Sequence, residues 1–232
     1  MQTICNWLKT YNIPIRPKSE AIHLRKENHC NLSKEIIEWI NGELLGDGCL
    51  QSLSKYSASF RYGSKYLEYI EYVRDTLKLF GIEQSGKIGI QKDKRYGSFS
   101  YKYTSRSYVE LLPIYKQWYP NGKKIIPKDI ELTPLTCRQW YIGDGSLGYE
   151  KNGKAHITLY TIGFIVSDVE WLKKQLIKLG FKATRQPSNN SIGISVSSVK
   201  DFLEYIGDCP VEHYQYKWNY EKEMRKLCLL PT

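Results

Sequence analysis

Two stretches of this chain end in the same three residues, Gly-Asp-Gly, and each closes a segment of helical character. They are IleAsnGlyGluLeuLeuGlyAspGly at 40–48 and CysArgGlnTrpTyrIleGlyAspGly at 137–145. Asp144 thus follows Asp47 by 97 positions (144 − 47). The repetition predicts two copies of one structural unit, each supplying one carboxylate to a shared place. Because a carboxylate at a helix C-terminus faces the negative end of the helix dipole, a compensating cation such as a divalent metal is expected there.

The repetition continues downstream of both motifs. Alternating strand-like stretches occupy 56–62, 98–106, 155–161 and 191–197, and helical patterns occupy 64–80 and 168–179. Gly81 and Gly180 follow these helices as left-handed stops, and Ser167 with Glu170 fits a capping box for the second. Each half therefore reads αββαββα. We predict an α+β fold of two pseudo-symmetric repeats whose antiparallel sheets form a saddle.

The expected boundaries follow from the motif helices and the linker between them. Ser33 is a suitable N-cap for the first motif helix, and a Pro-containing linker precedes the second. We expect an N-terminal extension at 1–32, a first repeat with linker at 33–131 and a second repeat at 132–232. Gly42 and Gly46 share one helix face, which permits another helix to approach closely. Since Gln139 stands where Gly42 does, the closest approach is expected near the acids.

Composition narrows the class of protein. The chain has 232 residues and a net charge of +10, a balance that favours a polyanionic partner, most often nucleic acid. No apolar run approaches the roughly 20 residues of a membrane span, and the N-terminus lacks a secretory h-region. Six cysteines without a Cys-x-x-Cys pair indicate reduced thiols rather than zinc or disulfides. An intracellular protein that is neither secreted nor membrane-bound is expected.

The polar faces of the expected sheets are the candidate DNA-contacting surface. A twisted antiparallel ribbon can enter a major groove, where Lys, Arg, Ser, Thr and Tyr side chains contact bases. A plain solvated sheet face is the alternative interpretation. The candidate DNA-contacting residues are Lys55, Tyr56, Arg61, Lys92, Lys94, Arg95, Lys102, Arg106, Lys154, His156, Thr158, Tyr160, Arg185 and Ser195.

The two motif stretches resemble the signature helices of LAGLIDADG homing endonucleases. Two copies in one chain correspond to the monomeric, pseudo-symmetric members, and the likeness extends from about Ser33 to the C-terminus. The resemblance implies that Asp47 and Asp144 bind the metal, with the carbonyls of Gly46 and Gly143 as backbone ligands. Mg²⁺ is the implied cofactor, and Mn²⁺ is expected to substitute for it.

The remainder of the chain is similar to the yeast mitochondrial intron-encoded branch of that family. LysLysIleIlePro at 123–127 matches a segment that carries a basic active-site residue, which falls on Lys124. TyrLys at 216–217 matches the position of a second basic active-site residue, which falls on Lys217. A phosphate contact or a solvated side chain remains the alternative for each lysine.

The resemblance implies a site-specific endonuclease that cuts a long, non-palindromic double-stranded DNA target and leaves short 3′ overhangs. Two alternatives remain open at this point. One is an RNA-binding maturase that acts on its own intron, and the other is an inactive DNA-binding protein on the same scaffold. Retention of both acids and both lysines argues against the inactive scaffold, because binding alone needs no metal-binding acids.

Overall fold

The computed structural model describes residues 2–16, 21–22, 29–92, 97, 99–150 and 153–220. The first repeat contains α3 (Lys34–Leu45), β1 (Cys49–Ser54), β2 (Ser57–Ser64), α4 (Leu67–Leu79), β3 (Gly89–Lys92), β4 (Phe99–Thr104) and α5 (Leu111–Trp118). The second contains α6 (Pro134–Asp144), β5 (Gly145–Tyr149), β6 (Ala155–Leu159), α7 (Val166–Lys178), β7 (Ala183–Gln186), β8 (Ser191–Ile194) and α8 (Val196–Ile206). The αββαββα order is thereby confirmed in both halves.

The two sheets share one topology, and their first strand pairs share one register. Their strand orders are β1-β2-β4-β3 and β5-β6-β8-β7, and all neighbouring strands are antiparallel. Cys49 pairs with Arg61 in the first sheet, and Ser146 pairs with Thr158 in the second. Both residues of the second pair follow their counterparts by 97 positions (146 − 49 and 158 − 61), the same offset that separates the two acids. An offset of 97 therefore relates each residue of β2 to its equivalent on β6.

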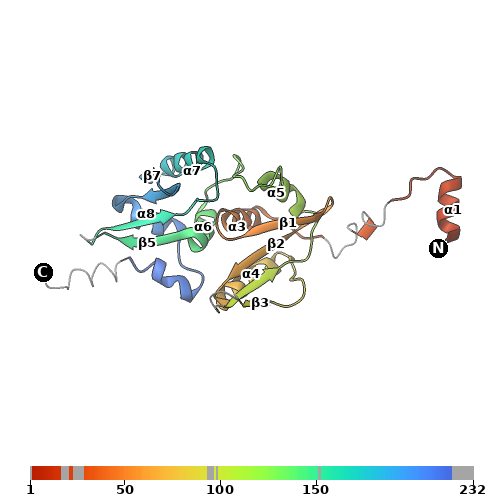
Figure 1. The fold of residues 1–232 in the computed structure, drawn as a ribbon, viewed down its shortest axis with the longest axis horizontal. Coiled ribbons are helices and arrows are strands. Elements are labelled where there is room, and N and C mark those ends of the chain that lie inside the picture. The colour runs from red at the N-terminus through yellow and green to blue at the C-terminus, as the bar shows by residue number, and fades with distance from the viewer. Residues whose placement is uncertain are drawn as a thin grey trace.

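Helices α3 and α6 pack side by side at the centre, between the two sheets (Figure 1). The side chain of Ser33 accepts a hydrogen bond from the amide of Ile36, which confirms the expected N-cap. We expected the closest approach near the acids, at the C-terminal ends of these helices. The structure shows close approach at Gly42 as well, one turn earlier in α3. A Cβ on Gly42 would lie 2.5 Å from the Thr136 carbonyl oxygen and 2.7 Å from Cβ of Gln139. Gly42 thus provides the space that Gln139 occupies.

The remaining helices cover the inner faces of the sheets. Helices α4 and α5 contact the first sheet, and α7 and α8 contact the second. Gly81 and Gly180 adopt positive φ angles of 76° and 95°, as expected for left-handed stops. The capping box predicted for α7 is wrong, because the helix begins at Val166 and no side chain caps it. The carboxylate of Glu170 instead accepts a hydrogen bond from Arg185.

Two further helical elements flank the repeats, one before the first repeat and one after the second. Helix α1 (Gln2–Thr10) stands away from the rest of the molecule at one end of its long axis (Figure 1). The 3₁₀ helix η2 (Glu212–Lys217) follows α8 and places Lys217 in a buried position. Within the described residues, no helix is both long and apolar enough to cross a membrane.

Candidate active site

The two acids meet where α3 and α6 end. Asp47 follows the last turn of α3, and Asp144 is the last residue of α6. A Cβ on Gly46 would lie 3.3 Å from Cα of Gly143, so the backbones touch immediately before the acids. Asp47 is exposed and Asp144 is half-buried. The small residues of both motifs therefore bring two carboxylates to one place, as the repeat predicted.

The electrostatics of this place disfavour two negative charges. Partial removal from water is the largest cause that raises the pKa of Asp144, to about 6, and the charge of Asp47 adds to it. The pKa of Asp47 is raised as well, chiefly by the same loss of hydration. Lys124 and Lys217 counteract both shifts. Two crowded carboxylates that resist joint ionisation favour a bound cation.

The two predicted lysines both reach this place. Nζ of Lys124 donates to the carbonyl oxygens of Gly46 and Gly48, at 3.3 and 2.9 Å. Nζ of Lys217 donates to the carbonyl oxygens of Ile142 and Tyr141, at 2.7 and 3.4 Å. Each lysine thus holds the end of the motif helix in its own half.

Burial affects both ammonium groups. It is the largest cause that lowers the pKa of Lys217, to about 8, while the negative charge of Asp47 opposes that shift. Burial also lowers the pKa of Lys124, and Asp144 acts on this lysine more strongly than Asp47 does. Of the two motif acids, the one in the opposite half acts more strongly on each lysine, although Cys49 acts on Lys124 more strongly than either acid.

The donor set fits a hard divalent cation. The described residues contain no group of three or more His, Cys, Asp or Glu side chains that could hold a metal ion. A cation at Asp47 and Asp144 would therefore take its other oxygens from backbone carbonyls, water and substrate. Mg²⁺ is commonly bound in this way, through one or two carboxylates together with substrate phosphates.

A cavity of about 210 Å³ lies beside Asp144. Its lining includes Lys124, Gly46 and the loop that follows β6. That loop carries Phe164, whose ring lies 5.7 Å from Nζ of Lys124. The cavity gives access from the surface to one acid and one lysine.

Comparison with known proteins gives the family of this chain. Residues 37–202 match the LAGLIDADG DNA endonuclease family. The chain belongs to this family. Its two motif helices are α3 and α6, and the family's fold is also found in a solved structure of similar architecture. That structure, the homing endonuclease I-WcaI bound to its DNA recognition sequence, aligns over 90% of this chain and 96% of its own with a TM-score of 0.70 and 21% identity.

Two curated relatives are similar in sequence. An uncharacterised protein of Methanocaldococcus jannaschii is 31% identical over 150 residues, which cover 63% of this chain and 57% of that protein. The cytochrome b mRNA maturase bI2 of Debaryomyces hansenii is 27% identical over 206 residues, which cover 80% of this chain and 75% of the maturase. The chain thus spans little more than half of the first relative.

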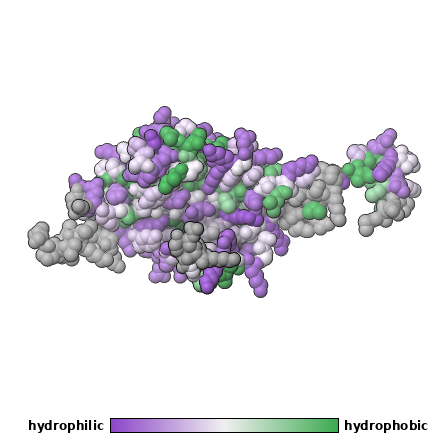
Figure 2. All heavy atoms as spheres, viewed as in Figure 1, coloured by the Kyte–Doolittle hydropathy of each residue, from purple (hydrophilic) through white to green (hydrophobic). Residues whose placement is uncertain are grey.

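In this LAGLIDADG chain the strand register decides which candidate DNA contacts share the outer sheet face. Arg61 pairs with Thr104, and Lys102 lies two positions from Thr104, so both point away from the helices. His156 and Thr158 lie on the corresponding face of β6. Tyr160 follows that strand and is exposed. Figure 2 shows the visible face of the central body as mostly hydrophilic.

Three candidates do not lie on the outer face. Lys92 alternates with Gly89 and Gln91 along β3, so it points to the side opposite Lys102. Arg185 also points inward, where it donates to Glu170 and to Asn190. Ser195 is not on a strand at all, because β8 ends at Ile194 and Ser195 is the N-cap of α8. The register therefore places these three residues off the outer face, and their contact with DNA stays a prediction.

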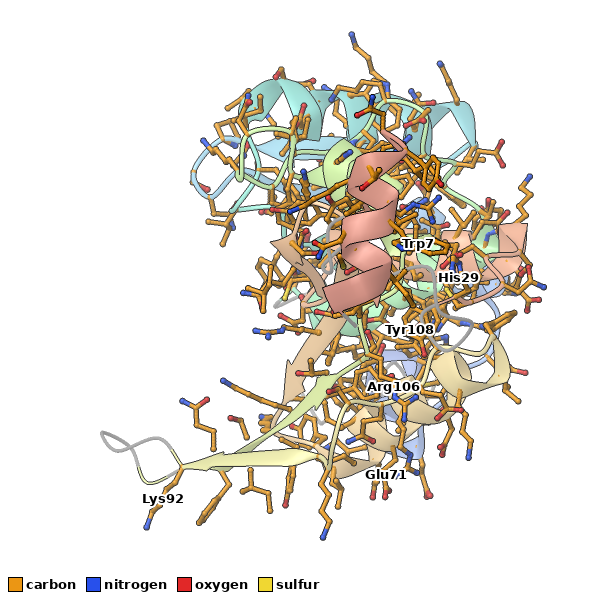
Figure 3. The ribbon with its side chains drawn as sticks, turned by 90° about the vertical axis from the view of Figure 1, so that its right-hand side faces the viewer. Trp7, His29, Glu71, Lys92, Arg106 and Tyr108 are labelled. Atoms are coloured by element: carbon orange, nitrogen blue, oxygen red, sulfur yellow. The ribbon has the colours of Figure 1, made fainter. Side chains whose placement is uncertain are left out.

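The other candidates lie at the edges of the sheets. Lys55 and Tyr56 form the turn between β1 and β2, where Nζ of Lys55 lies 5.0 Å from the Tyr56 ring. Arg106 follows β4 near Tyr108, far from Lys92 at the projecting end of β3 (Figure 3). Lys154 precedes β6. Lys94 and Arg95 lie outside the described residues.

Sequence reasoning missed three groups close to the acids. Glu43 is fully buried in α3, where its Oε1 accepts a 2.6 Å hydrogen bond from the Tyr69 hydroxyl. The hydroxyl of Tyr62 lies near enough to Asp47 to lower the pKa of that carboxyl. Burial raises the pKa of Tyr214 of η2, and the charge of Asp47 adds to that shift. Glu43 stands inside the motif and could have been noticed there, but 19 tyrosines in the chain gave the two others no distinguishing signal.

Proposed function

We propose that this chain is a site-specific endonuclease that hydrolyses both strands of a double-stranded DNA target with a divalent metal. The observation that carries the proposal is the convergence of Asp47 and Asp144 at the ends of two packed helices, with one lysine from each repeat beside them. Two scissile phosphates need two sets of such groups. The DNA recognition sequence bound by the similar I-WcaI supports this kind of substrate.

The residues have distinct tasks in the proposed reaction. Asp47 and Asp144, with the carbonyls of Gly46 and Gly143, would hold Mg²⁺ or Mn²⁺. When bound, the cation neutralises phosphate charge and makes water a better nucleophile. Lys124 and Lys217 fix the helix ends that present these ligands and place positive charge where the pentacovalent phosphate develops its negative charge.

The sheets determine the form of the proposed target. The outer face of the first sheet carries Arg61 and Lys102, whereas the matching face of the second carries His156 and Thr158. Because these faces differ chemically, the two halves of a bound site must differ in sequence. We therefore propose a long, non-palindromic target, cut by a monomer to leave short 3′ overhangs.

The test uses DNA that spans the uninterrupted insertion site, made by joining the sequences that flank the reading frame. With Mg²⁺ the protein should cut both strands, and with EDTA it should cut neither. Asp47→Asn and Asp144→Asn should each abolish double-strand cleavage, because the cation would be lost, while DNA binding persists in a gel-shift assay.

The control for these substitutions is Asp201→Asn, which removes an exposed carboxylate of α8 far along the chain from both motifs. This variant should cut like the unaltered protein. Robust double-strand cutting by either motif variant would contradict the assignment of the acids.

A second function is favoured by one observation, the 27% identity to a cytochrome b mRNA maturase. The net charge of +10 that favours DNA binding would also favour RNA binding, because both partners carry phosphates. The two proposals separate in one experiment, in which tight binding of the intron RNA without cleavage of any DNA target favours the maturase. Cleavage together with RNA binding indicates both activities.

A further inference from the structure

Tyr141 lies in the last turn of α6, where it contacts Lys217 in two ways. Its hydroxyl donates a 2.7 Å hydrogen bond to the carbonyl oxygen of Lys217. In return, Nζ of Lys217 donates to the carbonyl oxygens of Tyr141 and Ile142, at 3.4 and 2.7 Å. The side chain of each residue therefore holds the backbone of the other, and the pair links η2 to the end of α6.

The ring of Tyr141 has little freedom to move. It is fully buried and meets Phe202 and Trp218 edge-on, with 5.8 and 5.0 Å between ring centroids. A Cβ on Gly145 would overlap this ring, so glycine at the end of the second motif makes the space that the ring fills. A fixed ring gives its hydroxyl a fixed direction, and the carbonyl oxygen of Lys217 lies in that direction.

The first repeat holds its lysine differently. The offset of 97 positions between the motifs places Leu44 where Tyr141 stands, and both side chains are fully buried. Leucine has no hydroxyl and cannot form the equivalent bond. The backbone beside Lys124 is held instead by a hydrogen bond from the amide of Ile125 to the carbonyl oxygen of Trp118, at 2.8 Å. The hydrogen bond from a motif helix to the lysine backbone thus belongs to the second repeat.

We propose that Tyr141 is a positioning residue that fixes η2 and thereby holds the ammonium group of Lys217 at the end of α6. The proposal rests on the proposed nuclease function. The last carbonyls of a helix have no partners within it, and a cation is favourable there because it faces the negative end of the helix dipole. Lys217 supplies that cation, but it is the last residue of a 3₁₀ helix of only six residues. The bond from Tyr141 ties this short element to α6 at the lysine itself.

The experiment compares Tyr141→Phe with a matched control, Tyr205→Phe. The Tyr205 hydroxyl also donates a 2.7 Å hydrogen bond to a backbone carbonyl oxygen, that of Leu132, which precedes the first turn of α6. Each strand of the target duplex is labelled separately, and its rate of cleavage in Mg²⁺ is measured in a single turnover. Lys217→Met, alone and combined with Tyr141→Phe, tests whether the tyrosine acts through the lysine. Circular dichroism and a gel-shift assay follow folding and DNA affinity.

Tyr141→Phe should slow, about tenfold, whichever strand or strands Lys217→Met slows, because a small displacement of a reacting group is costly. Its DNA affinity should stay within twofold of the original. In the Lys217→Met background, Tyr141→Phe should cause no further slowing, since the group that it positions is absent. Tyr205→Phe should leave the cleavage rate of both strands within twofold.

Four results would overturn the inference while the nuclease function stands. Tyr141→Phe may leave both rates unchanged, slow a strand that Lys217→Met does not affect, or add further slowing to Lys217→Met. The fourth is a Tyr141→Phe variant that fails to fold, which would show a purely structural role because phenylalanine keeps the ring. If the unaltered protein cuts neither strand, the proposed function fails and the inference falls with it.

Discussion

At the scale of single residues, Glu43 is the least expected feature of the motif helices. Its side chain is fully buried, and Oε2 finds no hydrogen-bond partner among the described residues. Burial is the largest cause that raises its pKa to about 8, while the hydrogen bond from Tyr69 opposes the shift. A carboxyl group with a pKa of about 8 is mostly protonated at pH 7. Its equivalent in the second motif is Trp140, an apolar residue of the core.

Glu43 should make the folding stability depend on pH. Its folded pKa of about 8 lies above the ordinary value of 4.5, so the folded state binds the proton more tightly. Stability from this group is fully present below about pH 4.5 and falls as the pH rises toward 8. Glu43→Gln should remove that dependence and leave the variant more stable than the unaltered protein at pH 8, by a few kcal/mol at most.

Chemical denaturation at pH 5 and pH 8 measures this effect as a difference between proteins, which cancels the contributions of other titrating groups. Glu35→Gln, a change of an exposed residue in the first turn of the same helix, serves as the control and should keep the original pH dependence. An unchanged dependence in Glu43→Gln would contradict the proposed neutral carboxyl group.

Single residues also show what sequence could not provide. Asp47 and Asp144 were identifiable because they repeat at one spacing in two motifs. Tyr62 belongs to neither motif, and its buried position on the inner face of the first sheet depends on how β2 pairs with β4. Arg185 was misplaced because β7 is only four residues long, Ala183–Gln186, and its inward side is fixed by pairing with β8. The local periodicity of the sequence reveals neither the position of Tyr62 nor the inward direction of Arg185.

At the scale of elements, the α3–α6 interface depends on Gly42. A methyl group there would meet the backbone carbonyl of Thr136 at 2.5 Å, and backbone atoms cannot rotate out of the way. Gly42→Ala should therefore destabilise the fold by about 1–3 kcal/mol, the usual cost of overpacking, despite alanine's better helix propensity. The free energy of unfolding from urea titration measures the loss.

Gly163→Ala is the matched control for the change at Gly42. A Cβ at Gly163 meets nothing within 4 Å, and this glycine has no positive φ. The control should leave stability within about 0.5 kcal/mol of the original. If Gly42→Ala were equally tolerated, the close helix contact would be contradicted.

Elements were predicted best where one face of a helix is uniformly apolar. The helices after both motifs lie within a few residues of their expected bounds, because Val73 and Leu77 or Leu172 and Leu176 lie fully buried at helical spacing. The strand expected at 191–197 ended early, since the apolar–polar alternation continues into α8. Ser195 follows that alternation while it begins a helix, so a period of two alone could not find the boundary.

At the scale of the whole molecule, the two repeats share a topology and differ in the charge of their outer faces. Among the described strand residues, Arg61 and Lys102 supply cationic charge to the outer face of the first sheet. Duplex DNA releases condensed counterions where such charges meet phosphates, so the logarithm of affinity falls with the logarithm of salt concentration. The slope of this dependence is proportional to the number of phosphate contacts.

Lys102→Gln should make the slope shallower by about 1, the amount expected for one lost phosphate contact, and should weaken DNA binding at low salt. Lys92→Gln makes the same chemical change on a neighbouring strand. Because Lys92 points to the opposite side and its Nζ lies 5.6 Å from the Phe99 ring, its loss should leave the slope unchanged. Fluorescence anisotropy of a labelled duplex from 50 to 300 mM salt gives both slopes. Equal slopes for the two variants would mean that strand register does not determine which lysines face the DNA.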